Sequence, residues 1–250
     1  MLMMSKTAFR TLVLGIKKRQ INALGEAISA LESSSSVKFK LLKSFQNVSY
    51  RGCSIGITGS AGSGKSTLIA ALAKVIRRDK KTVAIVAVDP TSPKTGGAFL
   101  GDRVRMQQLV EDPGVFIRSM ASRGARGGVA HATKDVAHLL LKAGYDFVLI
   151  ETVGAGQLDD EVTKIADLTL LVLTPEAGDE MQFMKGGLKE LADAFVINKA
   201  DRPGAQTMES FLKRSEINAP IFKTVAEQKK GIDPLYQFIL RKKLEVRNNK

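Results

Sequence analysis

The chain has 250 residues, of which 44% are hydrophobic and 25% charged, values that are ordinary for one globular α/β domain. No apolar run approaches the roughly 18 residues that a membrane-spanning helix needs, and a single cysteine excludes a disulfide framework. We therefore expect a cytoplasmic protein without a membrane span. The mitochondrial matrix is the alternative, because the first 20 residues are basic and contain no acid.

Residues 1–50 are predicted to form a basic, helical N-terminal extension. Apolar side chains recur there at helical spacing, at Ile21, Leu24, Ala27, Ile28 and Leu31. Ser33 to Ser36 form a polar break before the core. Much of the net charge of +13 lies at the two ends of the chain. We interpret these ends as solvated helices, with an acidic partner such as anionic lipid or nucleic acid as the alternative. Nucleic acid is disfavoured because no recognisable nucleic-acid-binding module accompanies the charge.

After residue 50 strands and helices alternate, which favours a mostly parallel sheet covered on both faces. We expect strands at 53–58, 82–88, 115–118, 146–151, 168–173, 194–197 and 221–225. Helices are expected near 65–78, 103–111, 129–143, 181–191, 205–215 and 232–245. Together with the phosphate-binding loop described next, this alternation predicts an α/β, three-layer P-loop nucleoside triphosphatase fold over residues 51–246, with a frayed tail at 247–250.

A phosphate-binding loop is indicated by GSAGSGKST, which follows the apolar strand at 53–58 and matches G-x-x-x-x-G-K-[ST]. Its glycines let the backbone curl so that amide N–H groups point at phosphate oxygens. Lys65 is expected to bridge the β- and γ-phosphates and to be exposed to ligand rather than packed, while the Ser66 hydroxyl ligates Mg2+. The predicted nucleotide-binding residues of this loop are Gly59, Ser60, Ala61, Gly62, Ser63, Gly64, Lys65, Ser66 and Thr67.

Further candidates follow two of the other predicted strands. Asp89 ends one strand and Asp102 lies in the glycine-rich stretch after it; both are predicted to hold Mg2+-bound waters or to position the attacking water. Glu151 ends another strand, and Gly154 completes a D-x-x-G pattern with Glu for Asp, so that its N–H could sense the γ-phosphate. The loop from Arg118 to Gly128 is read either as a solvated turn or as a partner or phosphate contact.

A base-recognition motif, Asn198-Lys-Ala-Asp201, follows the apolar strand at 194–197. In this N-K-x-D arrangement the Asp201 carboxylate accepts from guanine N1–H and the exocyclic amine, while Asn198 and Lys199 brace the loop. Adenine would leave the carboxylate unpaired, so we expect GTP and GDP to be preferred over ATP.

The chain resembles the ArgK/MeaB/MMAA family of GTPases over about residues 16–240. The resemblance is carried, in order and at similar spacing, by GSAGSGKST, AVDPTSPKTGGAFLGDRVRM, SRGARGGVA, ETVGAGQ, PEAGDEMQFMKGG and NKAD. It implies a GTPase that acts as a chaperone for an adenosylcobalamin-dependent mutase such as methylmalonyl-CoA mutase. From the residues themselves we expect hydrolysis to be slow without a partner, because no glutamine directly follows Gly154. The family is usually dimeric, which implies a homodimer.

The resemblance also assigns roles to residues. It implies that Lys65, Ser66 and Thr67 bind phosphates and Mg2+, and that Asn198, Lys199 and Asp201 read guanine. Metal and water contacts would come from Asp89, Asp102 and Glu151.

The segment from Gly178 to Gly187 resembles an additional switch loop of the family. Its Asp179, Glu180, Gln182 and Lys185 would carry partner-dependent signals to the nucleotide. The chain departs from the family pattern in two places. Val225-Ala226 replaces the usual Ser-Ala, so the Ala226 N–H contact to guanine is kept and a hydroxyl is lost. In the family a longer helical arm serves dimerisation, and no such arm follows the last predicted helix here. The sequence therefore does not decide between a monomer and a dimer.

Two other functions remain open. A metallochaperone GTPase would need metal ligands, for which only His131, His138 and Cys53 are candidates. A nucleotide-dependent interaction module at a membrane or on nucleic acid would use the basic termini.

Overall fold

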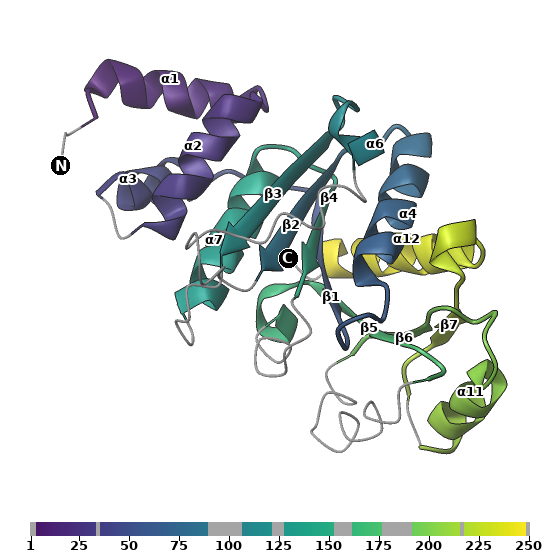
Figure 1. Ribbon diagram of the computed structural model, residues 1–250. Coiled ribbons are helices and arrows are strands. Elements are labelled where there is room, and N and C mark those ends of the chain that lie inside the picture. Colours follow the sequence, from purple (N-terminus) through teal and green to yellow (C-terminus); the bar gives the residue numbers. More distant parts are fainter. Residues whose placement is uncertain are drawn as a thin grey trace, which may run out of the picture.

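In a computed structural model the protein has a parallel sheet with helices on both faces (Figure 1). The structure describes residues 4–33, 36–89, 107–121, 128–152, 162–176, 192–215 and 218–248. The strands are β1 (Cys53–Thr58), β2 (Val83–Asp89), β3 (Val115–Ala121), β4 (Phe147–Glu151), β5 (Leu168–Leu173), β6 (Ala194–Ile197) and β7 (Ile221–Lys223). Within the described residues they form one seven-stranded sheet in the order β3-β2-β4-β1-β5-β6-β7. The predicted α/β P-loop fold is confirmed.

The helices are α1 (Lys6–Lys17), α2 (Ile21–Glu32), α3 (Ser36–Phe45), α4 (Lys65–Arg78), α6 (Gln107–Val110), α7 (Gly128–Lys142), α11 (Ala205–Arg214) and α12 (Ile232–Asn248), with a 3-10 turn η1 (Ala226–Gln228). The helix expected at 103–111 is described only over α6. The helix expected at 181–191 lies outside the described residues.

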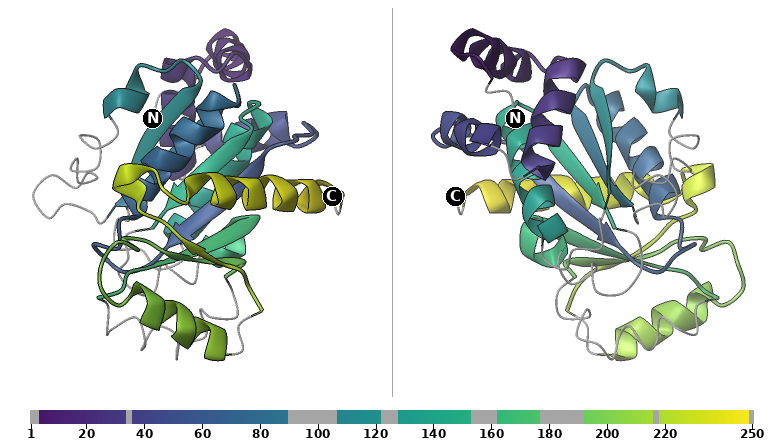
Figure 2. Two further views of the ribbon diagram at one scale, coloured as in Figure 1. Left: turned by 90° about the vertical axis from the view of Figure 1, so that its right-hand side faces the viewer. Right: turned by 60° about the vertical axis from the view of Figure 1, so that its left-hand side comes forward.

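The sheet is buried on both faces, which explains the unbroken apolar runs in its sequence. All residues of β1, β4, β5 and β6 are buried. One face packs against α4 and α12, whose buried side chains include Leu72 and Tyr236. The other face packs against α7 and the N-terminal helices (Figure 2).

The N-terminal helices share this second core with the sheet. On α2, Leu24 and Ile28 are fully buried. Arg118 of β3 donates to Ser29 Oγ at 3.1 Å and to Glu32 Oε2 at 3.3 Å, both on α2. The helices are therefore fixed to the domain by apolar and polar contacts together. The domain boundary at residue 50 stays a prediction.

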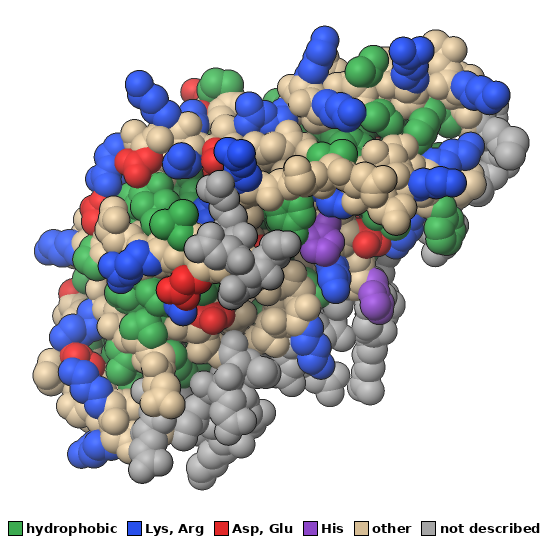
Figure 3. Space-filling model, turned by 180° about the vertical axis from the view of Figure 1, so that it is seen from behind, with side chains coloured by type: hydrophobic (Ala, Val, Ile, Leu, Met, Phe, Trp, Pro, Cys, Tyr) green, Lys and Arg blue, Asp and Glu red, His purple; other side chains and the backbone are tan. Residues whose placement is uncertain are grey.

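The outer surface of these helices carries many basic side chains (Figure 3). Exposed cations there include Lys6, Arg10, Lys17 and Lys18. This distribution agrees with the interpretation of the N-terminal charge as a solvated surface.

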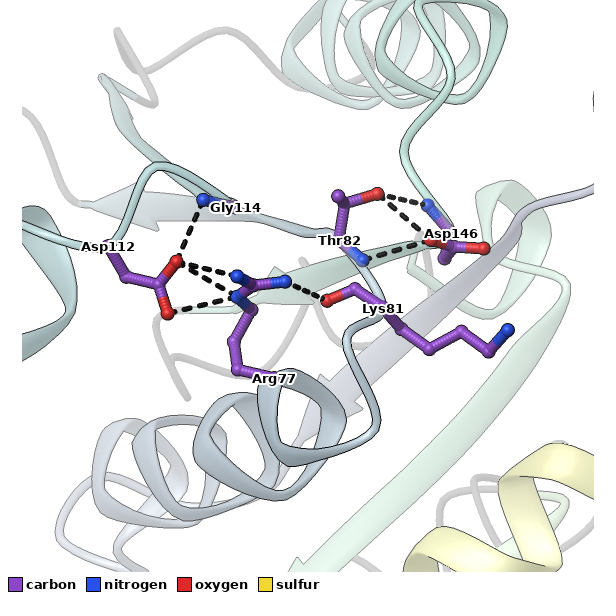
Figure 4. Close-up of polar contacts among 6 residues, drawn as sticks. All are labelled: Arg77, Lys81, Thr82, Asp112, Gly114 and Asp146. Atoms are coloured by element: carbon purple, nitrogen blue, oxygen red, sulfur yellow. Dashed lines mark hydrogen bonds and ion pairs between the residues drawn. The ribbon is translucent and has the colours of Figure 1, made fainter.

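Aspartates that immediately precede strands tie the sheet together at the amino ends of its strands. Asp146 precedes β4 and accepts from Thr82 N at 2.9 Å and from Thr82 Oγ1 at 3.0 Å (Figure 4). Asp167 precedes β5 and accepts from Ser54 N at 2.9 Å. Asp193 precedes β6 and accepts from Thr169 N at 2.8 Å. These strand ends lie at the edge of the sheet opposite the phosphate-binding loop. The three aspartates therefore satisfy backbone N–H groups of neighbouring segments away from the site.

A partly exposed ion pair joins the end of α4 to the segment before β3 (Figure 4). Arg77, in the last turn of α4, donates from Nε to Asp112 Oδ1 at 3.0 Å and Oδ2 at 2.9 Å. The hydrogen bond from Arg77 holds the pKa of Asp112 below its usual range. Burial on its own would raise the pKa of Asp146, but the hydrogen bonds from Thr82 and the charge of Lys243 outweigh it and lower the pKa.

Candidate nucleotide-binding site

The predicted site residues meet at the carboxyl edge of the sheet. The loop at 59–64 joins central strand β1 to α4, and β4 ends at Glu151 beside it. Ile57 of β1 lies opposite Glu151, and Leu173 of β5 lies opposite Ile197, the residue before Asn198. In open parallel sheets ligands bind at this edge, because the loops that follow the strands converge there.

Three loop positions require glycine. Gly59, Gly62 and Gly64 have φ of +140°, +82° and +88°. A Cβ on Gly59 would overlap the carbonyl oxygen of Val172, and a Cβ on Gly64 would overlap Nδ2 of Asn198. The curled backbone of the phosphate-binding loop is therefore fixed by conformation and by close packing.

The side chain of Lys65 is more buried than the sequence led us to expect. Its side chain is not exposed but packed, with the residue 6% exposed. Its Nζ donates to the carbonyl oxygens of Gly59 at 2.8 Å and Ser60 at 2.9 Å. The loop curls around the ammonium, because peptide carbonyls stabilise a charge that burial would otherwise disfavour.

Ser66 and Glu151 form the polar centre of the phosphate end. Ser66 Oγ donates to Glu151 Oε1 at 2.6 Å, and both residues are buried. This short bond between a hydroxyl and a carboxylate is of the charge-assisted kind. A hydroxyl and a carboxylate are hard oxygen donors, so this pair fits the ligand preference of Mg2+.

Of the other predicted metal and catalytic residues, the structure describes only the backbone of Asp89. Asp89 is the last residue of β2, where it pairs with Ala121 of β3. Ala87 of the same strand lies opposite Glu151, so the backbone of Asp89 reaches the same edge of the sheet. Asp102 and Gly154 lie outside the described residues.

Asn198 joins the phosphate loop to the base-recognition loops. Its Nδ2 donates to Ser63 O at 2.9 Å, and its Oδ1 accepts from Thr224 Oγ1 at 3.1 Å and from Ala226 N at 3.2 Å. Asn198 is 2% exposed. The Ala226 N–H, expected to contact guanine, thus donates to Asn198. Sequence analysis missed Thr224, a buried polar residue directly after β7, which only tertiary contact reveals.

The remaining residues of the N-K-x-D motif differ in their surroundings. Lys199 has φ of +54°, and its Nζ donates to Gly62 O at 2.7 Å. Asp201 is exposed and is not among the residues that line the pocket. Arg202 follows it and donates from Nη1 to both carboxylate oxygens of Glu176 at 2.7 Å. This pairing raises the pKa of Arg202.

A pocket of about 690 Å3 joins these groups. Its lining residues are Gly62, Gly64, Lys65, Ser66, Thr67, Ala70, Ala71, Lys74, Glu151, Lys199, Arg202, Ala226, Glu227 and Lys229. Of these, Ala70, Ala71, Lys74, Arg202, Glu227 and Lys229 were not predicted. Helical spacing from Ser66 would have placed Ala70 and Lys74 on the same face of α4. Predicted residues that do not line the pocket are Gly59, Ser60, Ala61, Ser63, Asn198, Asp201 and Val225. Of these, Gly59 and Ser60 accept from Lys65, and Asn198 accepts from Ala226 N.

A glycine-rich loop after the central strand of a parallel sheet, with a second recognition loop after β6, defines a P-loop nucleotide-binding protein. The family described as "Methylmalonyl Co-A mutase-associated GTPase MeaB" matches residues 24–249. The chain belongs to this family and is a GTPase.

Similar proteins carry related names. A protein of Pyrococcus horikoshii named as a GTPase is 43% identical over 235 residues, which cover 90% of this chain and 74% of that protein. GTPase ArgK of Escherichia coli is 37% identical over 198 residues, covering 74% of this chain and 60% of that protein. A solved structure described as LAO/AO transport system kinase has a TM-score of 0.77 with 23% identity, and covers 99% of this chain and 79% of that one. This last similarity concerns the fold. The predicted resemblance to the ArgK/MeaB/MMAA family is confirmed.

The described residues also bear on the two alternative functions. They hold no group of three or more His, Cys, Asp and Glu side chains that could bind a metal ion. Of the candidate ligands, Cys53 is buried in β1, and His138 lies 6.3 Å from Tyr50 between ring centroids. No helix in the part of the chain that the structure covers is long and apolar enough to cross a membrane.

Proposed function

We propose that this GTPase binds GTP and Mg2+ in the pocket and gates cofactor loading and protection of an adenosylcobalamin-dependent acyl-CoA mutase such as methylmalonyl-CoA mutase. The observation that carries the nucleotide assignment is the position of Asn198. One buried amide contacts the phosphate loop at Ser63 and the base loop at Ala226. These two hydrogen bonds support a site in which the phosphate loop and the base loop bind one nucleotide together.

The residues present fit phosphoryl transfer from GTP to water. The N-terminus of α4 directs backbone N–H groups and the positive end of its dipole at the phosphates. Lys65 holds a positive charge beside the loop, where charge on the β- and γ-phosphates develops during hydrolysis. Mg2+, when bound, neutralises phosphate charge; Ser66 and Glu151 are the described residues that would hold it. Asp89, Asp102 and Gly154 remain proposed contributors to the metal and water contacts.

The partner is proposed from family membership, since the family is described as mutase-associated. The segment from Gly178 to Gly187 lies outside the described residues, and its role as a switch stays a proposal. A P-loop GTPase that lacks a positioned charge or a water-orienting group hydrolyses GTP slowly. A partner can raise the rate of hydrolysis by several orders of magnitude. We therefore propose slow intrinsic hydrolysis that the mutase accelerates. We also propose that the protein forms a homodimer.

Single-turnover GTP hydrolysis, measured with and without the mutase, tests this function. The wild type should be slow alone and faster with the mutase. Lys185→Ala should lose the acceleration while keeping its intrinsic rate and nucleotide affinity. Lys40→Ala, which changes an exposed lysine of α3, is the matched control and should respond like the wild type.

Fast hydrolysis by the isolated wild type, or acceleration that survives Lys185→Ala, would contradict the switch assignment. Absence of a response to any cobalamin-dependent mutase would favour the metallochaperone or the interaction module. Metal analysis and salt-dependent pull-downs with liposomes or RNA separate those two alternatives.

A further inference from the structure

We infer that the outer face of helix α1 binds the surface of a membrane that contains anionic lipids. This surface, the α1 face, is made of Lys6, Arg10, Leu14 and Lys17. The inference goes beyond the proposed function, because it concerns contact of the folded protein with lipid headgroups and takes no residue from the nucleotide pocket.

Helix α1 is a peripheral helix. It packs chiefly against α2 and lies beyond α2 at the outer edge of the molecule (Figures 1 and 2). Its start is capped, since Ser5 Oγ accepts from Ala8 N at 3.1 Å. Its buried residues are Leu12, Gly15 and Ile16. A helix that buries one side against a single neighbour leaves the opposite side to solvent.

The solvent side of α1 is a basic stripe. The four residues of the α1 face follow one another at intervals of four and three residues, which places them on one side of a helix. All four are exposed. The helix contains no acidic residue. Among the residues that the structure describes, the three cations of the α1 face form no ion pair, so their charge is available to an anionic partner.

Bulky apolar side chains lie among these cations. Leu14 is 51% exposed in the middle of the α1 face, and Ile21, just after the turn that ends α1, is 69% exposed. Of the five exposed large hydrophobic residues in the described part of the chain, three lie within residues 4–50: Leu14, Ile21 and Phe39. Cations beside exposed apolar side chains are typical of a helix that lies on an anionic bilayer, where the ammonium groups meet headgroups and the apolar side chains enter the acyl boundary.

The residue types favour lipid over protein and nucleic acid. Protein interfaces are enriched in arginine and aromatic residues and depleted in lysine, whereas two of the three cations of the α1 face are lysines and Lys18 follows them. Nucleic acid would bind the cations through its phosphates but would leave Leu14 and Ile21 without a contact. An anionic lipid surface uses both kinds of side chain.

Co-sedimentation with vesicles tests the inference. The probes are vesicles of phosphatidylcholine alone and of an equimolar mixture of phosphatidylcholine and phosphatidylserine. The triple variant Lys6→Gln, Arg10→Gln and Lys17→Gln removes three cations and keeps a good helix former at each position. We expect the wild type to bind only the mixed vesicles and the triple variant to bind them about a hundredfold more weakly, at about fivefold per cation near an anionic surface.

Two further variants separate the α1 face from the overall charge. The triple variant Arg214→Gln, Lys230→Gln and Arg241→Gln is the matched control, because it removes the same charge from exposed positions elsewhere. We expect it to bind the mixed vesicles nearly as the wild type does. Leu14→Gln keeps all cations and should bind about tenfold more weakly, since an apolar side chain no longer enters the bilayer.

Equal loss in the two triple variants would assign vesicle binding to total charge and overturn the inference. Wild-type binding by Leu14→Gln, or no binding of the mixed vesicles by the wild type, would overturn it as well. Binding of a mixed-sequence RNA that requires the α1 cations, without vesicle binding, would assign the face to nucleic acid instead. Intrinsic GTP hydrolysis should be unchanged in all variants, so failure of this inference and failure of the proposed function are distinguishable.

Discussion

A methyl group on Gly64 would overlap Nδ2 of Asn198, so the phosphate loop and the base-recognition loop touch at a position where only glycine fits. Asn198 donates from the same nitrogen to Ser63 O at 2.9 Å. Each loop therefore sets the conformation of the other.

Gly64→Ala should for this reason weaken nucleotide binding strongly. The substitution forces an alanine to a φ of +88° and displaces the Asn198 amide. We expect GDP affinity to fall about a hundredfold or more, as judged from strain and lost hydrogen bonds of about 1–3 kcal/mol each. Calorimetry measures it. Gly25→Ala on α2 is the control: a Cβ there meets nothing within 4 Å, so the variant should bind normally and gain about 0.5–1 kcal/mol of stability.

Asp201 should determine the choice of base. We expect GTP and GDP to bind roughly tens of times more tightly than ATP and ADP, since adenine has an acceptor at N1 and no amine at C2 and so offers the carboxylate no matching donors. Asp201→Asn should shift the preference toward xanthine nucleotides, whose changed edge an amide matches. Competition titrations with guanine, adenine and xanthine diphosphates measure both effects. Equal affinity of the wild type for guanine and adenine nucleotides would sink the assignment.

Lys65→Ala should affect catalysis and stability together. The ammonium is the positive charge beside the phosphates, so GTP hydrolysis should fall by orders of magnitude. Because Nζ also bonds to Gly59 O and Ser60 O, the free energy of unfolding should fall by about 1 kcal/mol. Single-turnover hydrolysis and urea unfolding test the two parts. Hydrolysis at the wild-type rate would show that the loop assignment is wrong.

Acid should weaken the fold through Asp112 and Asp146, whose pKa values are lowered. A carboxyl with a lowered folded-state pKa stabilises the fold fully above its unfolded pKa of about 3.9. That contribution is lost as pH falls through the lower folded-state pKa. Asp146→Asn keeps an acceptor for Thr82 but cannot titrate, so it should reduce the loss of stability between about pH 5 and pH 2.

Urea unfolding as a function of pH measures this slope. Glu26→Gln, at an exposed acid of α2, is the control. An unchanged acid slope in Asp146→Asn would contradict the role of that carboxylate.

Local sequence patterns predicted most of the fold. The apolar runs placed β1, β5 and β6 at their observed bounds, because these strands are buried on both faces and read as continuous apolar segments. The predicted strand at 221–225 ends earlier, at Lys223, since Val225 turns back to pair with Lys230. Helix α12 continues to Asn248, past the predicted end at 245, because the residues there contain no glycine or proline to stop it.

Site residues were predictable from the sequence where the local conformation of a motif alone determines their position. The glycines of the phosphate loop belong to this class, since each positive φ follows from local conformation. Arg202 and Lys229, which line the pocket, and Thr224, which contacts Asn198, belong to the other class, because they come together only when β6 and β7 pair and η1 folds back. Burial of Lys65 was missed for the same reason: the carbonyls that hold it face inward only after the loop has curled.

The loops that form the pocket follow strands that differ in the number of neighbouring strands with which they pair. The phosphate loop follows β1, which pairs with β4 on one side and β5 on the other. The loop that holds Ala226 and Lys229 follows β7, a three-residue strand at the edge of the sheet. Opening of such an edge costs less free energy than opening of the centre, so its amides should exchange hydrogen sooner. Nucleotide dissociation should then begin at the base, with the phosphates released last, and a partner that braces the β7 edge would slow exchange without touching the catalytic end.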